Sequence, residues 1–322
     1  MPFRRVSDAR ITHGREHDQV VIAGRPRRGT RLAATVLVAA SLAAGCAMGG
    51  PPPPAAAPVV SPPPRPAVVP PPAASPAPAP SRARAAVDAT AAAAQERGGV
   101  TLGVAVLDRT TGQTAANDEG ATPLRAASVA KLFTIVDILT RREAGQLTTT
   151  PDDEDRFRRA LSLSDDDAMN ALWSTYGGPA GIDRVASMLG LAETSPPADT
   201  SQWGEVRTSA RDVAALYAFV TTRLAPADHD LVMQSLADAP STAADGFDQG
   251  FGLLDPTRRG SAVAKQGWLC CIGSSVDLHS AGFPDADGRY VVVLLSNQPR
   301  GYDAARTLLD DAAAAARDAL AG

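Results

Sequence analysis

Among the 31 basic residues of this 322-residue chain there are only two lysines, Lys131 and Lys265. Lys131 lies within a strongly apolar segment, and burial of an unpartnered ammonium favours loss of its proton. Ser128 lies three residues earlier, on the same face of the expected helix and near its N-terminus, where the helix dipole disfavours an ammonium. This spacing predicts a serine nucleophile with Lys131 as its base. A lysine that extends to the edge of the helix would give the same pattern.

Lys265 begins the segment Lys265-Gln266-Gly267, which lies in a predicted strand facing the helical part of the chain. Arginine cannot give up its proton in a protein, so a site that needs a tunable ammonium must use lysine. In a chain that otherwise uses arginine, the two lysines therefore indicate a chemical role. The alternative for Lys265 is an ordinary surface lysine.

Ser164 and the three aspartates that follow it open another predicted helix. A serine hydroxyl at this place could relay a proton. The ordinary interpretation is also strong, because Ser and Asp commonly cap helices and acidic residues are favoured in a first turn.

Other classes of chemistry have little support. No pair of His and Cys residues outside the N-terminal stretch has zinc-ligand spacing, and no glycine-rich phosphate loop is present. We therefore expect neither a metal nor a cofactor. Residues 82–322 carry 22 basic and 32 acidic residues, a net charge of about −10, which would repel nucleic acid.

The elements that would position these side chains are strands at both ends of residues 82–322 and helices between them. Residues 127–142 are apolar on all sides, as expected of a buried helix. One antiparallel sheet built from both ends, flanked by helices and interrupted by an all-helical lobe, gives an α+β domain. The predicted strands are 100–107, 113–116, 262–271, 275–283 and 290–296, and the predicted helices are 82–95, 127–142, 153–161, 168–176, 181–189, 209–223, 228–237 and 304–320.

The N-terminal part of the chain is typical of an exported protein. Residues 1–46 contain an arginine cluster, an apolar run too short to span a bilayer, and small residues before Cys46. This end resembles a bacterial lipobox, which implies a lipid on Cys46 and anchoring at the outer face of the cytoplasmic membrane; secretion with a free Cys46 is the alternative. Residues 47–81 are rich in Pro and Ala, so we predict an unfolded, extended linker.

The order Ser-x-x-Lys, Ser-Asp-x, Lys-x-Gly resembles the active-site motifs of penicillin-binding proteins and class A β-lactamases. With the lipobox and linker, the chain is similar to alanine-rich actinobacterial lipoproteins of the LppW type. The resemblance implies a β-lactamase or transpeptidase-like fold for residues 82–322. It implies a peptidoglycan peptide or β-lactam as substrate. The roles it implies are Ser128 as nucleophile, Lys131 as base, Ser164 as proton relay, Lys265 as the carboxylate-binding residue, and the backbone N–H groups of Ser128 and Trp268 as the oxyanion hole.

The motifs depart from the family pattern in three places. Asp166 stands where the family has an Asn that donates to a substrate amide oxygen, and Gln266 replaces a Thr while keeping a donor. The family's E-x-x-x-N loop, which activates the hydrolytic water, is missing, and Glu193 and Glu205 are the only candidates near its place. We therefore expect an acyl-enzyme with slow deacylation. The alternative is an inactive domain that binds peptidoglycan or a partner protein.

The remaining cysteines, Cys270 and Cys271, are neighbours in a predicted strand. In a regular strand their side chains would point to opposite faces, and their Cα atoms would be closer than most disulfides allow. The sequence predicts two free thiols, with a strained disulfide near the site as the alternative.

Overall fold

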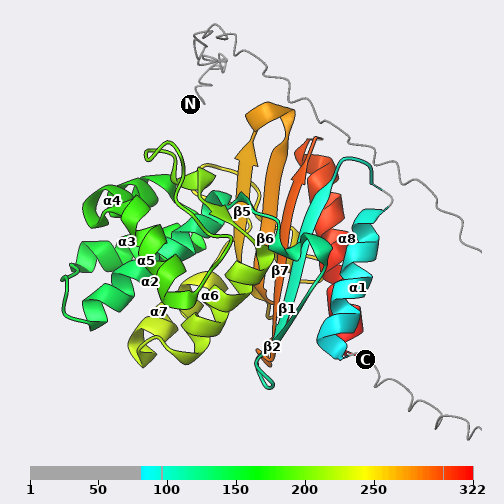
Figure 1. Ribbon diagram of the computed structural model, residues 1–322, viewed down its shortest axis with the longest axis horizontal. Coiled ribbons are helices and arrows are strands. Elements are labelled where there is room, and N and C mark those ends of the chain that lie inside the picture. Colours follow the sequence, from blue (N-terminus) through cyan, green and yellow to red (C-terminus); the bar gives the residue numbers. More distant parts are fainter. Residues whose placement is uncertain (1–80, 96, 300, 322) are drawn as a thin grey trace, which may run out of the picture. The chain divides into compact units, whose positions relative to one another are not determined.

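A computed structural model describes residues 81–95, 97–299 and 301–321. Its centre is a five-stranded antiparallel sheet in the order β2-β1-β7-β6-β5, in which strands from the two ends of the domain lie side by side (Figure 1). Its strands are β1 (Thr101–Asp108), β2 (Gln113–Ala116), β5 (Val263–Cys270), β6 (Val276–Phe283) and β7 (Tyr290–Gln298). A separate two-stranded sheet pairs β3 (Leu124–Arg125) with β4 (Arg207–Thr208).

The central strands are buried on both faces, and their side chains alternate between two cores. Val292 and Leu294 of β7 face a core completed by α1 (Arg82–Gln95) and α8 (Tyr302–Ala321), the two terminal helices of the described chain. These helices pack against each other and cover one face of the sheet (Figure 1). The sheet and its first helical layer therefore bring together both ends of the domain.

Val291, Val293 and Leu295 alternate with those residues and face the second core, on the side of the helical lobe. Helix α6 (Ala210–Thr222) packs on β1 and β7, and the buried helix α2 (Ala130–Glu143) lies within the lobe (Figure 1). The helices of the lobe are α2 (Ala130–Glu143), α3 (Pro151–Ser162), α4 (Asp166–Tyr176), α5 (Gly178–Leu189), α6 (Ala210–Thr222) and α7 (Pro226–Ala237). The α+β architecture predicted from the sequence, one sheet from both chain ends with an inserted helical lobe, is confirmed.

The start of the buried helix differs from the prediction. Ala127–Val129 form a 3₁₀ turn, η2, and the α-helix begins only at Ala130. Ala127 has a φ of 47°, a conformation that residues with a Cβ rarely adopt. Ser128 therefore lies on a tight turn that leads into α2.

The two cysteines at the end of β5 correct another prediction. Cys270 and Cys271 form a disulfide rather than two free thiols. The prediction assumed a regular strand through both residues, whereas β5 ends at Cys270. The opposite-facing arrangement of side chains therefore does not apply here.

The predicted signal peptide (1–46), Cys46 and nearly all of the predicted linker (47–81) lie outside the described residues. No described helix has the length and apolar character needed to span a bilayer.

Candidate active site

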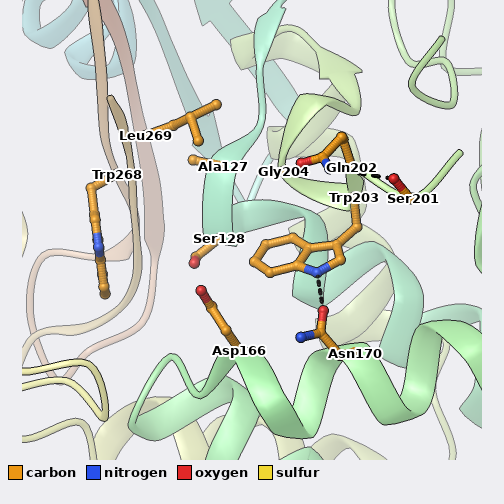
Figure 2. A pocket seen from close by; sticks show the side chains of 10 residues that line it. All are labelled: Ala127, Ser128, Asp166, Asn170, Ser201, Gln202, Trp203, Gly204, Trp268 and Leu269. Carbon is orange, nitrogen blue, oxygen red and sulfur yellow. Dashed lines mark hydrogen bonds between the residues drawn. The ribbon is translucent and has the colours of Figure 1, made fainter. Parts of the chain in front are cut away.

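A cleft of about 290 Å³ opens between the end of β5 and the helical lobe (Figure 2). Ser128 lines it, and Trp203 and Trp268 lie on opposite sides of the serine in this view. The cleft is lined by Ala127, Ser128, Asp166, Asn170, Ser201, Gln202, Trp203, Gly204, Trp268 and Leu269. The turn η2, helix α4, the segment around Trp203 and strand β5 all contribute to it.

Ser128 and Lys131 are in contact, as their spacing predicts. Lys131 Nζ lies 2.9 Å from Ser128 Oγ, because η2 and the first turn of α2 place the two side chains on one face. The lysine is fully buried, and its Nζ also donates to the backbone carbonyl of Ser164 at 2.6 Å. A buried amine is thus held directly beside a serine hydroxyl that lines the cleft.

Ser164 connects the two lysines of the chain. Its Oγ lies 3.3 Å from Lys131 Nζ and 2.7 Å from Lys265 Nζ. Ser164 precedes α4 and has a φ of 52°, so its hydroxyl is placed by an unusual backbone conformation. Hydrogen bonds therefore run without interruption from Ser128 through Lys131 and Ser164 to Lys265.

Burial and mutual repulsion both act on the two amines. Burial lowers the pKa of Lys131, while the negative charge of Asp166 opposes that shift. Burial lowers the pKa of Lys265 well below the ordinary lysine value, and the positive charge of Lys131 lowers it further. Two ammonium groups sharing one hydroxyl would repel each other, so this arrangement favours at least one neutral amine.

Asp166 makes a contact that the sequence analysis did not predict. Its Oδ1 lies 2.6 Å from Lys131 Nζ, and Figure 2 shows its carboxylate directed toward Ser128. We expected Asp166 to face the substrate and Lys131 to lack a partner. The structure places Asp166 on the cleft and also pairs it with Lys131.

Strand β5 forms the other wall of the cleft, and Gly267 allows its close approach to the serine turn. A Cβ on Gly267 would lie 3.2 Å from the carbonyl oxygen of Ala126 and 3.3 Å from Val129 Cγ2, both tighter than ordinary contacts. Trp268 lines the cleft, while its indole stacks on Phe247 with ring centroids 4.5 Å apart.

Lys265 and Gln266 differ from their expected positions. Lys265 is only 1% exposed and is absent from the cleft lining, so it lies behind Ser164 rather than on a surface that binds carboxylates. The Gln266 amide donates to the backbone carbonyls of Gln249 and Phe251. Gln266 is 1% exposed and does not line the cleft, so its amide serves these backbone carbonyls instead of facing a ligand.

Trp203 and Asn170 are lining residues that the sequence analysis missed. Trp203 Nε1 donates to Asn170 Oδ1 at 2.8 Å, and Lys131 Nζ lies 4.7 Å from the centre of the Trp203 ring. Asn170 could have been found, because it lies one helical turn after Asp166 on the same face. Trp203 lies in a loop-like segment whose path no periodicity predicts.

Neither Glu193 nor Glu205 lines the cleft. The backbone N–H of Glu193 instead donates to Asp212, next to the start of α6. Among the described residues, Asp166 is thus the only carboxylate in the lining of the cleft.

Fold and sequence together establish the class of the protein. The model of the family "Beta-lactamase2: Beta-lactamase enzyme family" matches residues 153–320, and the chain belongs to this family. The match contains Ser164, Asp166 and Lys265, while Ser128 and Lys131 precede it.

Curated relatives of the chain include mycobacterial proteins. A protein named "Putative lipoprotein LppW" in Mycobacterium bovis is 38% identical over 218 residues, which cover 66% of this chain and 68% of that protein. The protein of the same name in Mycobacterium tuberculosis matches with the same values.

Solved structures share the fold at low sequence identity. A β-lactamase from Chitinophaga pinensis is 17% identical, with a TM-score of 0.57 over 72% of this chain and 97% of that chain. The structure of PBP-A is 18% identical, with a TM-score of 0.58 over 73% of this chain and 96% of that chain. The described domain therefore has a β-lactamase-like fold.

Proposed function

We propose that the domain is a serine acyl-transfer enzyme that forms an acyl-enzyme on Ser128 with a peptidoglycan peptide or a β-lactam. The observation that carries this proposal is the contact between Ser128 Oγ in the cleft and the buried amine of Lys131. A neutral amine in this place can take the serine proton, which a surface lysine cannot do at neutral pH. The family match and the β-lactamase-like fold add support to this proposal.

In the proposed reaction, Ser128 Oγ attacks the carbonyl carbon while its proton moves to Lys131 Nζ. The backbone N–H groups of Ser128 and Trp268 stabilise the oxyanion. The bond from the carbonyl carbon to the leaving nitrogen then breaks, and the proton passes from Lys131 through Ser164 Oγ to that nitrogen. Lys265 supports the relay through its hydrogen bond to Ser164.

Release of the acyl group is the slow step in this proposal. Hydrolysis needs a water activated by a base, and neither Glu193 nor Glu205 reaches the cleft. We therefore propose that the adduct persists, as in a penicillin-binding protein.

We also propose that the protein is an exported lipoprotein, anchored through Cys46 at the outer face of the cytoplasmic membrane with residues 47–81 as its spacer. The motif at Cys46 and the name of the mycobacterial relative support this proposal. Such an anchor would place the cleft near the cell wall.

Intact mass after incubation with benzylpenicillin tests the function. We expect one adduct with the mass of the whole β-lactam, stoichiometric with protein and lost slowly. Ser128→Ala should abolish it, and Ser201→Ala, which changes a serine in the same cleft, should leave it. Rapid release would contradict the slow step. Prolonged incubation that gives no adduct on Ser128 would refute the enzymatic proposal.

The second candidate is a non-catalytic domain that uses the same cleft for binding. The ion pair between Asp166 and Lys131 favours it, because a carboxylate beside the amine stabilises the protonated lysine. Absence of an adduct in the experiment above would select this candidate.

A further inference from the structure

The cleft has an unusual distribution of charge for a site that would accept an anionic β-lactam. Asp166 is the only one of its ten lining residues with a charged side chain. Both lysines lie behind the lining and are buried. A second carboxylate, Asp245, accepts a hydrogen bond from Trp268 Nε1 at the wall of the cleft. The surface that a ligand meets therefore carries negative charge.

The Asp166 side chain is available to a ligand. It is 57% exposed, and only its Oδ1 contacts Lys131. Its other oxygen, Oδ2, has no hydrogen-bond partner among the described residues. A carboxylate can only accept hydrogen bonds, so this oxygen would attract an ammonium and repel an amide carbonyl oxygen or a second carboxylate.

We propose, on the basis of the function proposed above, that Asp166 makes the cleft selective for acyl donors that carry an ammonium close to the reacting carbonyl. The contact between Asp166 and Lys131 gives this preference a chemical consequence. While Lys131 is neutral, the charge of Asp166 lacks the counter-charge that a protonated lysine provides. A substrate ammonium beside Asp166 would supply this counter-charge. It would thereby favour the neutral form of Lys131, which the attack of Ser128 requires.

The two indoles reinforce this selectivity. Trp203 and Trp268 flank Ser128, and the face of an indole ring attracts cations (Figure 2). The ring of Trp203 already lies against an amine, with Lys131 Nζ 4.7 Å from its centre. A substrate ammonium would thus meet a carboxylate and aromatic faces in a single cleft.

The experiment compares three penicillins with the same nucleus and different charges on the side-chain α-carbon. Ampicillin carries an ammonium there, benzylpenicillin a hydrogen, and carbenicillin a carboxylate. We expect the second-order rate constant for acylation of Ser128, measured by intact mass at neutral pH and low salt, to fall in that order. The first and last should differ by about tenfold, which is about 1.4 kcal/mol, because their side chains differ by two unit charges beside a largely exposed carboxylate.

Asp166→Asn tests whether the carboxylate causes this order, and Asp167→Asn is the matched control. Asp167 is the next residue of α4, is exposed and does not line the cleft. The ratio of ampicillin to carbenicillin rates should approach one in Asp166→Asn, after correction for intrinsic reactivity, and stay unchanged in Asp167→Asn. The same ratio in all three proteins would overturn the proposal.

Equilibrium binding separates this inference from the proposed function. Ser128→Ala cannot form the adduct but retains Asp166, so it should bind ampicillin more tightly than carbenicillin in calorimetry. Adding Asp166→Asn should remove the difference. If the wild type forms no adduct while Ser128→Ala keeps this preference, the enzymatic function fails and the selectivity stands. Equal binding of the two penicillins by Ser128→Ala overturns the selectivity.

Discussion

The hydrogen bonds of Lys131 indicate which of its protonation states supports attack. Two of its partners, the carbonyl oxygen of Ser164 and the carboxylate of Asp166, can only accept hydrogen bonds. A neutral amine has two hydrogens and one lone pair. If the hydrogens serve these two acceptors, the lone pair remains for the hydroxyl of Ser128. The same contacts that bury the amine thus orient it as a base.

The first prediction follows from the opposing influences on the pKa of Lys131. Burial lowers that pKa, and the charges of Asp166, Asp165 and Asp245 raise it. Acylation by benzylpenicillin should therefore increase with pH as Lys131 loses its proton, with a midpoint below the ordinary lysine value of 10.5. Asp166→Asn removes the largest opposing charge, so it should move the midpoint to lower pH.

Acylation rates measured across the pH range by intact mass check this prediction, with Asp167→Asn as the control. An upward shift in Asp166→Asn would contradict the influence assigned to the carboxylate. Lys265 also acts in this cluster, because its positive charge repels Lys131 and because the charge of Asp166 raises the pKa of Lys265 as well.

Residue type and spacing were enough to predict the contact of Ser128 with Lys131, whereas the contact of Ser164 with Lys265 was not predicted. Lysines in an arginine-rich chain have few explanations, and a separation of three residues fixes a shared face. Alternation along β5 would not have predicted which of its side chains line the cleft, since Gln266 and Trp268 share a strand face and only Trp268 lines it. The pairing of Asp166 with Lys131 could not be predicted either, since it depends on how α4 packs beside α2.

At the scale of elements, the cleft depends on the fit between β5 and the turn η2. Gly267→Ala would place a Cβ 3.1 Å from His279 Cδ2, in addition to its close contacts with Ala126 and Val129. We expect a loss of about 1–3 kcal/mol in the free energy of unfolding and slower acylation, because the strand must move away from the serine. Gly98→Ala is the control, since its Cβ would meet open space. The free energy of unfolding is measured with denaturant. Equal values for Gly267→Ala and Gly98→Ala would contradict the prediction, because they would show that β5 can move to accommodate the new Cβ without loss of stability.

Helix α3 offers a test of stability against pH. It begins with a reciprocal capping box between Thr150 and Asp153. Burial raises the pKa of Asp153, but hydrogen bonds from Thr150, Tyr176 and Arg156 outweigh it and lower the pKa to about 2. Since the ordinary value is 3.8, the folded state prefers the ionised carboxyl. This stabilisation is complete above about pH 4 and is lost as the pH falls toward about 2.

Asp153→Asn should remove this contribution, which is on the order of 2 kcal/mol. The free energy of unfolding of the wild type should approach that of the variant as the solution is acidified from neutral pH. Asp155→Asn, in the same helix but at an exposed position, serves as the control. A constant gap between wild type and Asp153→Asn at all pH values would contradict the assigned pKa.

Periodicity predicted the type and approximate bounds of the helices and strands, because the buried faces determine both. It did not predict the 3₁₀ turn at Ala127–Val129. The apolar pattern continues through that turn into α2, and only the packing of β5 against it distinguishes the turn from helix. The disulfide at Cys270 was missed for a similar reason, since the prediction extended a regular strand past the end of β5.

At the scale of the whole molecule, the proposed lipid anchor gives a prediction that depends only on the N-terminal segment. Cys46→Ala should move the protein from the membrane fraction to the soluble fraction, because the short apolar run cannot hold it there without a lipid. Immunoblots of fractionated cells check this, with Ser61→Ala, a change within the predicted linker, as the control. Unchanged membrane retention of Cys46→Ala would remove the lipoprotein proposal.

The pairing of β1 with β7 determines when this domain can fold. A chain that leaves a ribosome or a membrane pore N-terminus first presents the apolar β1 long before its central partner arrives. Until β7 and α8 follow, β1 lacks both its neighbour on one edge and much of the cover on one face. Contacts between segments so distant in sequence slow folding and leave strand edges open to aggregation. The sheet can therefore be completed only after β7 and α8 have emerged, which makes the exposure of β1 a matter of how fast the rest of the chain is delivered.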